Sequence, residues 1–451
     1  MTSLPFPRLR RLLTSMLCLA ALGQAHEASA LGLMQAYEAA LANDPAYRAA
    51  MYDNEAGQQF KELGLSHLLP TLSANYATSK NRADITTSKP DVLPENRSYT
   101  SLSASITLRQ PVLHLEGVAR YRQGIAQTSA SDAQFSARSQ DLIVRLASLY
   151  AAAKYAEDQL AQATAQRDAY AEQRRSNERL FQRGEGTRTE VLETQAKFDL
   201  SEAQVLEARD NVINSRYALS AMIGQDITTL EPLSDDFQVK PMQPVSYEEW
   251  KTLALANNPE IVAQRYAVEV ASEEINKNWA GHVPRLDLVA SASKSESDTV
   301  NTFNQNANIR SIGVQLTIPL YAGGSVDAAT SQAMSNYKKV QADLDTKTSQ
   351  VLVELRKQYN LTLSSVLRID AAAKSLSSAL LLVDATQKSV KGGQRTNLDV
   401  LNAQQQLFEA KRDLALARYN YLLGYVRLRY SAGTLGLADL KDVAVYFVAD
   451  K

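Results

Sequence analysis

The sequence predicts a mainly α-helical protein with membrane β-strands, built from a helix–strand–strand–helix–helix unit that occurs twice. Three observations lead to this prediction. Landmarks of the first half recur in the second, each half contains two stretches of alternating apolar and polar residues, and very long proline-free segments follow them. Hydrophobic residues make up 45% of the 451 residues and charged residues 22%, which is typical of a folded protein.

The composition excludes several classes of function. Lys and Arg total 48 against 49 Asp and Glu, and this near-neutral balance without a long basic run excludes a nucleic-acid-binding protein. Four histidines and one cysteine, scattered along the chain, leave no candidate metal or haem site. The sequence contains no nucleophile elbow, phosphate-binding glycine loop or metalloprotease motif, so we expect neither an enzyme nor a cofactor.

Residues 1–30 have the pattern of a signal peptide. A basic start that includes Arg8 precedes the apolar run Leu12 to Leu22, and Ala28-Ser29-Ala30 supplies the small-residue cleavage motif. The alternative is a transmembrane helix, which needs about 20 apolar residues and is therefore disfavoured. A leucine rather than a small residue precedes Cys18, so no lipid anchor is expected. No later stretch is long and apolar enough for a helical span.

The mature chain is duplicated. Leu41-Ala42-Asn43-Asp44-Pro45 recurs as Leu255-Ala256-Asn257-Asn258-Pro259, and Glu190-Val191-Leu192 recurs as Asp399-Val400-Leu401. Because these landmarks keep one order and nearly one separation, each half is expected to be a domain-sized repeat. The predicted organisation is a first repeat at 31–224, a linker at 225–246, a second repeat at 247–433 and a C-terminal segment at 434–451. We call the linker and the C-terminal segment the equatorial segments.

Each half contains two predicted strands in which apolar residues alternate with small polar ones. In the stretch 101–108, leucine, alanine and isoleucine share one face, and serine and threonine share the other. A soluble hairpin is the alternative, but this narrow apolar face is what a lipid-facing strand requires. The four strands are expected at about 71–83, 98–110, 285–297 and 308–319, with helix-to-strand joints at Pro70, Pro111, Pro284 and Pro319.

Four strands cannot close a barrel, and open strand edges are not tolerated in lipid. Eight strands from a dimer would enclose only side chains, whereas twelve from a trimer would leave a lumen. The sequence therefore predicts a trimeric, 12-stranded membrane β-barrel joined to long helices.

The predicted helices are far longer than those of globular domains. The segment from Leu115 to Gln182 lacks proline and would extend on the order of 100 Å as one helix. Its apolar residues alternate in steps of four and three, which is the heptad pattern of coiled-coil packing. The seam consists of Leu142, Leu146, Leu149, Ala153, Ala156, Leu160 and Ala163. An ordinary soluble coiled coil is the alternative.

At this point the sequence resembles a known family, the TolC outer-membrane efflux and secretion channels. The resemblance covers essentially the whole mature chain and is carried by the stretches 393–403, 417–421 and 433–435, together with Leu68-Leu69-Pro70 and Ile318-Pro319-Leu320. It implies a homotrimeric outer-membrane β-barrel, in contact with outer-membrane lipid, that an α-helical barrel extends into the periplasm of a Gram-negative bacterium. It also implies a periplasmic gate that an inner-membrane transporter and its periplasmic adaptor protein open.

The resemblance implies roles for individual residues at two hairpin turns, formed by Gly184 and Gly186 and by Gly392 and Gly393. In the family, an arginine and an aspartate at the second turn bond a hydroxyl and an acid at the first and hold the tip shut. The matching residues of this sequence are Arg395 and Asp399 at the second turn and Thr189 and Glu190 at the first.

Two features of these turns weaken the gate prediction. The family's prototype has a tyrosine and a second aspartate where this chain has Val390 and Asn402, so the resemblance does not extend to a tyrosine latch or a double acidic ring. The alternative role for Glu190 and Asp399 is helix capping, because 187–190 and 396–399 both have the Thr-x-x-acid pattern.

Three functions remain open at this stage. The first is an outer-membrane exit duct for type I protein secretion, working with an ABC transporter in the inner membrane. The second is the same duct in a multidrug efflux pump, working with a proton-driven transporter. The third is a periplasmic coiled-coil scaffold without a pore, which the lipid-facing strands disfavour. The lack of a lipidation motif and the resemblance over 393–421 favour the secretion branch.

Overall fold

A computed structural model describes residues 30–86, 94–234, 236–297 and 305–448. The predicted signal peptide therefore lies almost wholly outside the described residues. Within them, no helix has the length and apolar character of a membrane span. The chain forms two compact units, each of which takes segments from both halves of the sequence. We call Ala49–Ser139 with Trp250–Leu355 the strand unit, and Met1–Arg48 with Gln140–Glu249 and Arg356–Lys451 the helical unit.

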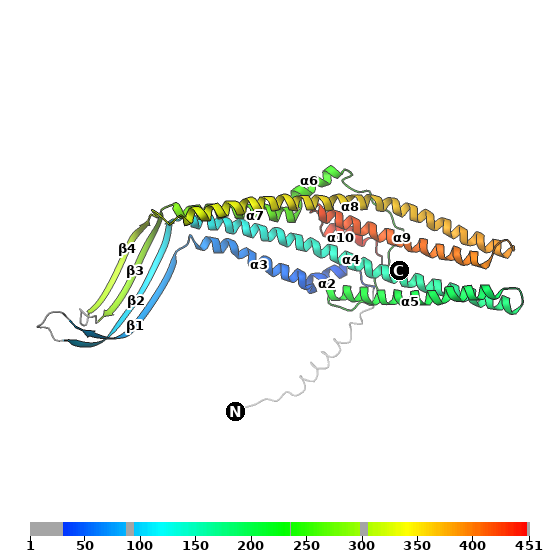
Figure 1. The fold of residues 1–451 in the computed structure, drawn as a ribbon, viewed down its shortest axis with the longest axis horizontal. Helices are drawn as coiled ribbons and strands as arrows, with labels where there is room; N and C mark the ends of the chain where they lie inside the picture. Colours follow the sequence, from blue (N-terminus) through cyan, green and yellow to red (C-terminus); the bar gives the residue numbers. More distant parts are fainter. Residues whose placement is uncertain (1–29, 87–93, 235, 298–304, 449–451) are drawn as a thin grey trace, which may run out of the picture. The chain divides into compact units, whose positions relative to one another are not determined.

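The strand unit contains a single antiparallel sheet with the strand order β1-β2-β3-β4 (Figure 1). Its strands are β1 (Thr71–Ile85), β2 (Glu95–Leu113), β3 (Arg285–Ser297) and β4 (Gln305–Thr317). The two central strands come from different halves of the sequence, so the halves join through the β2–β3 ladder. β1 and β4 form the two edges of this sheet in the described chain.

The register places residues of the same character on the same face. Ile106 of β2 lies opposite Ala74 of β1 and Ala292 of β3, while Ser105 lies opposite Ser293. The β2–β3 register shifts between Pro111 and Leu113, because proline has no backbone N–H to donate to the ladder. β2 thus continues through Pro111, beyond the predicted end at about residue 110.

The helices of the strand unit are α3 (Pro45–Ser66), α7 (Pro259–Trp279), the short helix η1 (Ala280–His282), and the first parts of α4 (Leu115–Gln182) and α8 (Ser325–Lys391), along with most of α6 (Tyr247–Asn257). α4 covers the predicted range in full as one helix of 68 residues.

α3 and α4 approach each other through glycines. A Cβ on Gly64 would lie only 2.6 Å from the Arg120 carbonyl oxygen and 2.9 Å from the Cα of Tyr121.

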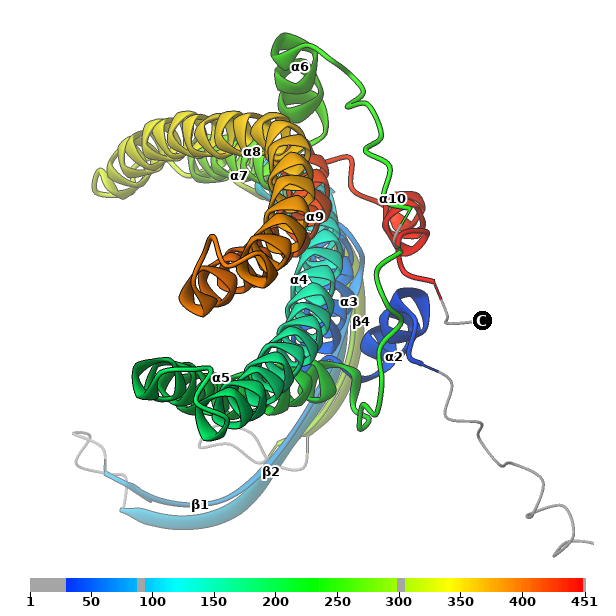
Figure 2. The same cartoon turned by 90° about the vertical axis from the view of Figure 1, so that its right-hand side faces the viewer.

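The helical unit contains α2 (Leu33–Asn43), α5 (Arg188–Ile223), α9 (Asn397–Ser431), α10 (Leu437–Ala444) and the remaining parts of α4 and α8. The short helices α2 and α10 contact each other beside these longer ones (Figure 2). The first part of the predicted seam forms the core here, since Leu142, Leu146 and Ala153 are fully buried. The hydroxyl of Tyr150 donates to the Leu31 carbonyl oxygen at 2.7 Å, which joins α4 to the chain before α2.

A buried ion pair fixes the link between α2 and α3. Asp44, whose side chain is 5% exposed, accepts a hydrogen bond from Arg145 of α4 at 2.7 Å and another from the backbone N–H of Tyr47 at 3.0 Å. Burial raises the pKa of Asp44, but the hydrogen bonds from Arg145 and from the backbone outweigh it and hold the pKa below its usual range. The carboxylate therefore stabilises the fold.

We expect Arg145→Ala to lower the free energy of unfolding at pH 7 by about 2 kcal/mol, since it leaves a buried carboxylate unpaired while Arg145 itself is about one-third exposed. Because the folded pKa of Asp44 is depressed, the contribution is present above about pH 4 and is lost as the pH falls through the folded pKa. The loss should therefore shrink at pH 3. Thermal unfolding at both pH values measures it, with Lys374→Ala, which breaks the exposed pair with Asp370, as the control. An equal loss in both variants would contradict the prediction.

Candidate functional site

The two hairpin tips of the helical unit have the same backbone construction. The first lies between the end of α4 at Gln182 and the start of α5, and the second between the end of α8 at Lys391 and the start of α9. Gly184 and Gly393 adopt left-handed φ angles of 77° and 71°, which favour glycine because it lacks a Cβ. Gly186 and Gly392 lie beside them without a left-handed φ.

At each tip, a capping box stabilises the start of the second helix. The Glu190 carboxylate accepts from the Thr187 backbone N–H at 2.8 Å, and the Thr187 hydroxyl oxygen accepts from the Glu190 N–H at 3.2 Å. The Asp399 carboxylate accepts from the Thr396 N–H at 2.9 Å. This backbone hydrogen bond, one from the Thr396 hydroxyl and the positive charge of Arg395 lower the pKa of Asp399. Both acids therefore cap helices, as the alternative interpretation of the sequence expects.

The other two predicted gate residues, Arg395 and Thr189, are exposed. Within the described residues of this single chain, neither side chain is recorded in a hydrogen bond or ion pair with the opposite hairpin. The charge of Arg395 acts on Asp399 of its own tip. The pairing of Arg395 and Asp399 with Thr189 and Glu190 thus stays a prediction.

The two hairpins are instead joined by a buried polar network just behind the tips. Asn177 of α4 is 3% exposed and donates to the hydroxyl of Thr194 in α5, which is 0% exposed, at 2.6 Å. Asn397, the first residue of α9, donates to the side-chain oxygen of Asn177. Gln173 in turn donates to the side-chain oxygen of Asn397 at 2.5 Å. The amide of Asn177 therefore links α4, α5 and α9.

This network is not among the sequence predictions, although a signal for it exists. The predicted heptad seam of α4 ends at Ala163, and the same steps of four and three continue to Tyr170 and Asn177. Tyr170 is buried, and burial raises its pKa. A single polar residue at a seam position specifies register and partner at some cost in stability, so Asn177 fits a role in alignment rather than in packing.

A polar groove follows the same helices further from the tips. It has a volume of about 350 Å³ and runs between α4, α5 and α9. Across it, Lys197 of α5 donates to the side-chain oxygen of Gln405 of α9 at 2.7 Å. Its lining is mostly glutamine and charged residues, so the hairpins do not share a dry apolar interface over this stretch.

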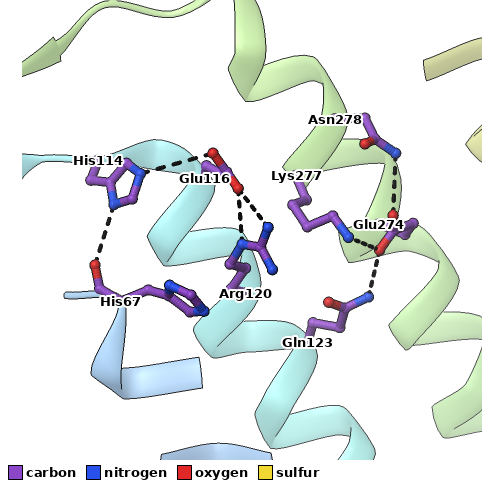
Figure 3. A network of polar contacts seen from close by, with 8 residues as sticks. All are labelled: His67, His114, Glu116, Arg120, Gln123, Glu274, Lys277 and Asn278. Carbon is purple, nitrogen blue, oxygen red and sulfur yellow. Dashed lines mark hydrogen bonds and ion pairs between the residues drawn. The ribbon is translucent and has the colours of Figure 1, made fainter. Parts of the chain in front are cut away.

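The helix-to-strand joints of the strand unit hold a second polar cluster (Figure 3). Pro70 and Pro284 directly precede β1 and β3, while Pro111 lies within β2 and Pro319 follows the end of β4. Beside these joints the ring of His114 contacts the His67 carbonyl oxygen at 3.2 Å, and Glu116 pairs with Arg120 at 2.7 Å. On α7, Glu274 accepts from Gln123 of α4 at 2.9 Å and from Lys277 at 2.5 Å. These contacts fix α4 beside α7.

The cluster does not form a metal site. Within the ranges that the structure describes, no group of three or more His, Cys, Asp and Glu side chains is arranged to hold an ion. The contacts of His67 and His114 are local bonds between neighbouring helix ends. The arrangement can position helices and strands.

Comparisons with known proteins agree on one family. A family model described as outer membrane efflux protein matches residues 36–225 and 250–434. The chain is 44% identical over 445 residues to the alkaline protease secretion protein AprF of Pseudomonas aeruginosa, covering 98% of the chain and 92% of AprF. It is 38% identical over 426 residues to the proteases secretion protein PrtF of Dickeya chrysanthemi, covering 93% and 92%. The solved structure of CusC matches with a TM-score of 0.78 at 17% identity, over 90% of this chain and 92% of CusC, which supports the fold alone.

Proposed function

Because the chain belongs to the outer membrane efflux protein family, whose model matches both halves of its sequence, we propose that it forms the exit duct of a type I protein secretion system. The protein is an outer-membrane channel component of a Gram-negative bacterium and not an enzyme. The resemblance to the TolC channels that the sequence indicates is thereby confirmed.

One observation carries the choice of secretion over drug efflux. Two relatives that match this chain over nearly its whole length, at 44% and 38% identity, are both named for the secretion of proteases. In the proposed mechanism an inner-membrane ABC transporter supplies the energy, and a periplasmic adaptor connects it to the helical tips. The substrate then crosses the outer membrane through the channel. The second candidate function is the outer-membrane channel of a proton-driven multidrug efflux pump, because the family is named for efflux.

We propose that three copies assemble into a 12-stranded barrel. The sheet of one chain leaves β1 and β4 as unpaired edges among the described residues, and these edges are 15 and 13 residues long. In lipid such edges must pair, and pairing β4 of one copy with β1 of the next closes the sheet. Three copies provide enough strands for an open lumen.

The proposed repeats at 31–224 and 247–433 are joined around their middle by the equatorial segments at 225–246 and 434–451. Three contacts support this organisation. Leu31 forms a parallel bridge with Leu230, and Leu233 forms an antiparallel bridge with Phe447. The Ser234 backbone N–H donates to the Tyr446 carbonyl oxygen at 2.8 Å. Both equatorial segments thus contact each other within the helical unit.

A deletion strain, assayed in two ways together, tests the proposed function. The first assay compares proteins in the culture supernatant, and the second measures susceptibility to dyes and detergents. Loss of one or a few secreted proteins with unchanged susceptibility is the expected result. Hypersensitivity with an intact set of secreted proteins would establish efflux instead. If neither changes, even after related channel genes are also removed, the pore function is wrong and the scaffold alternative gains support.

We further propose that Arg395, Asp399, Thr189 and Glu190 hold the tips together in the closed assembly. Arg395→Ala is expected to raise the resting conductance of channels in planar bilayers roughly fivefold, because an exposed charge pair contributes up to about 1 kcal/mol. Glu190→Gln should do the same while keeping the capping box, in which glutamine can replace glutamate.

Thr187→Ala is the matched control for this gate. It removes the hydroxyl bonds of the capping box of α5 without removing a charge from the tip. Its resting conductance should stay close to that of the wild type. If Thr187→Ala raises the resting conductance while Glu190→Gln, which keeps the cap, leaves it unchanged, Glu190 acts through helix capping and the proposed charge pairing is wrong.

A further inference from the structure

One face of the sheet carries an apolar window on neighbouring strands. On this face the apolar residues run over 102–108 of β2, 286–292 of β3 and 312–316 of β4, roughly 13–20 Å along each strand. The register confirms that these residues share a face, since Leu108 lies opposite Ala290 and Ala290 lies opposite Ile312. Under the proposed function this face contacts lipid.

Basic residues begin directly beyond the window, on the same face. On β4, Arg310 lies directly beyond Ile312, at the end of the window away from the helices. It lies opposite Ala292, the last apolar residue of the β3 window. Lys294 is the next residue of β3 on this face and lies opposite Ala104. On β1, Lys80 and Arg82 follow Tyr76 and Thr78 and lie opposite Thr100 and Ser98. We call Lys80, Arg82, Lys294 and Arg310 the basic rim.

The basic rim lies toward the ends of the strands that point away from the helices of the strand unit (Figure 1). All four side chains are exposed. Lys294 pairs with Glu296 at 2.6 Å, whereas no hydrogen bond or ion pair is recorded for Lys80, Arg82 or Arg310 with any described residue. The carboxylates on this face are those of Glu296 and Asp84, so the face carries four cationic and two anionic side chains. The rim therefore keeps a net positive charge.

We propose that the basic rim binds the phosphate groups of an anionic glycolipid in the outer leaflet of the membrane, with the acyl chains lying on the apolar window below. This inference rests on the proposed function, which orients the window in the membrane. Guanidinium and ammonium groups donate charge-assisted hydrogen bonds to phosphate, and near a low-dielectric lipid phase these bonds are screened less than in water. A window of apolar residues capped by cations matches a lipid that has a phosphorylated head and long chains.

The test measures binding of fluorescent diphosphoryl lipid A to the purified full-length protein in neutral detergent. The triple variant K80Q/R82Q/R310Q removes the three rim cations that have no recorded partner. Its affinity should fall at least tenfold, because each basic residue near an anionic lipid surface contributes a several-fold factor. Dephosphorylated lipid A should bind the wild type and the triple variant equally weakly.

A matched control lies on the opposite face of the sheet. Arg97 lies opposite Ala83, beside Arg82 along the ladder, but its side chain belongs to the other face and pairs with Glu95 at 3.1 Å. Arg97→Gln should leave lipid affinity unchanged. The proposed lipid site would be overturned if Arg97→Gln weakened binding as much as the triple variant does. It would also be overturned if the wild type bound dephosphorylated lipid A as tightly as diphosphoryl lipid A.

The proposed function is checked separately in the same preparations. Oligomeric state and recovery in the outer-membrane fraction report whether the wild type assembles as a channel. A wild type that assembles but binds both lipids alike would overturn the lipid site alone. A wild type that neither enters the membrane fraction nor oligomerises would overturn the proposed assembly and, with it, the orientation on which the lipid site rests.

Discussion

Gly64→Ala is expected to lower the free energy of unfolding by about 2 kcal/mol or more and to reduce recovery of assembled protein strongly. The new Cβ would meet the backbone of α4 at the Arg120 carbonyl oxygen and the Tyr121 Cα, and backbone atoms cannot rotate away as a flexible side chain can. Overpacking of this kind costs about 1–3 kcal/mol, and the cost here lies at the upper end. Alanine regains up to about 1 kcal/mol through its higher helix propensity, so the net effect stays destabilising.

Circular dichroism during heating, together with the yield in the outer-membrane fraction, measures this effect. Gly313→Ala is the control, since a Cβ on that residue of β4 meets no atom within 4 Å. Gly124→Ala makes the reciprocal contact, from α4 to the Phe60 carbonyl oxygen of α3. The combined Gly64 and Gly124 variant should lose less than the sum of the two, because either change already separates the helices. Stability equal to that of Gly313→Ala would show that α3 and α4 can part at little cost.

Asn177→Leu is expected to raise resting conductance at least fivefold, with the channel otherwise assembled. Leucine fills a similar volume but cannot accept from Asn397 or donate to Thr194. Thr194 keeps its bond to the Glu190 carbonyl oxygen at 2.6 Å, whereas the amide nitrogen of Asn397 loses its recorded partner. Asn397 is half-buried, and loss of a hydrogen bond costs about 0.5–1.5 kcal/mol, so the attachment of the start of α9 to α4 and α5 is weakened and only the bond from Gln173 remains.

Single-channel recording in planar bilayers checks this expectation, which depends on the proposed channel assembly. Thr386→Val is the control, because the hydroxyl of Thr386 is also buried but donates only within α8, to the Leu382 carbonyl oxygen at 2.7 Å. Both variants remove a buried hydrogen bond, and only Asn177→Leu removes a link between the hairpins. Closed channels in Asn177→Leu would mean that the network aligns the helices without holding the tip.

Regular elements could be predicted because a local pattern determines them. The absence of proline and the heptad seam predict α4 from Leu115 to Gln182, and alternation predicts the four strands. Thr-x-x-acid predicts both capping boxes, since a capping box closes within one turn of helix. The end of β2 was misplaced because Pro111 looks like a strand terminator, whereas the ladder accommodates it with a register shift.

The long-range polar contacts could not be predicted in the same way. Asn177 and Asn397 lie far apart in the sequence, and nothing local indicates that their amides meet. Burial of Asp44 against Arg145 depends likewise on how α4 passes the end of α2. A polar residue on a helix is usually solvated. The seam position of Asn177 indicates that its side chain is buried, but only the packing of the other helices identifies its partners.

The unpaired edges of β1 and β4 have a consequence for mixtures of chains. In the proposed trimer, each edge presents the same backbone groups whatever the state of the tips, so a copy with a defective tip would be incorporated as readily as an intact one. One defective subunit would then impair every assembly that contains it. A damaged allele should therefore be dominant over a normal one, and its severity should follow the ratio in which the two chains are synthesised.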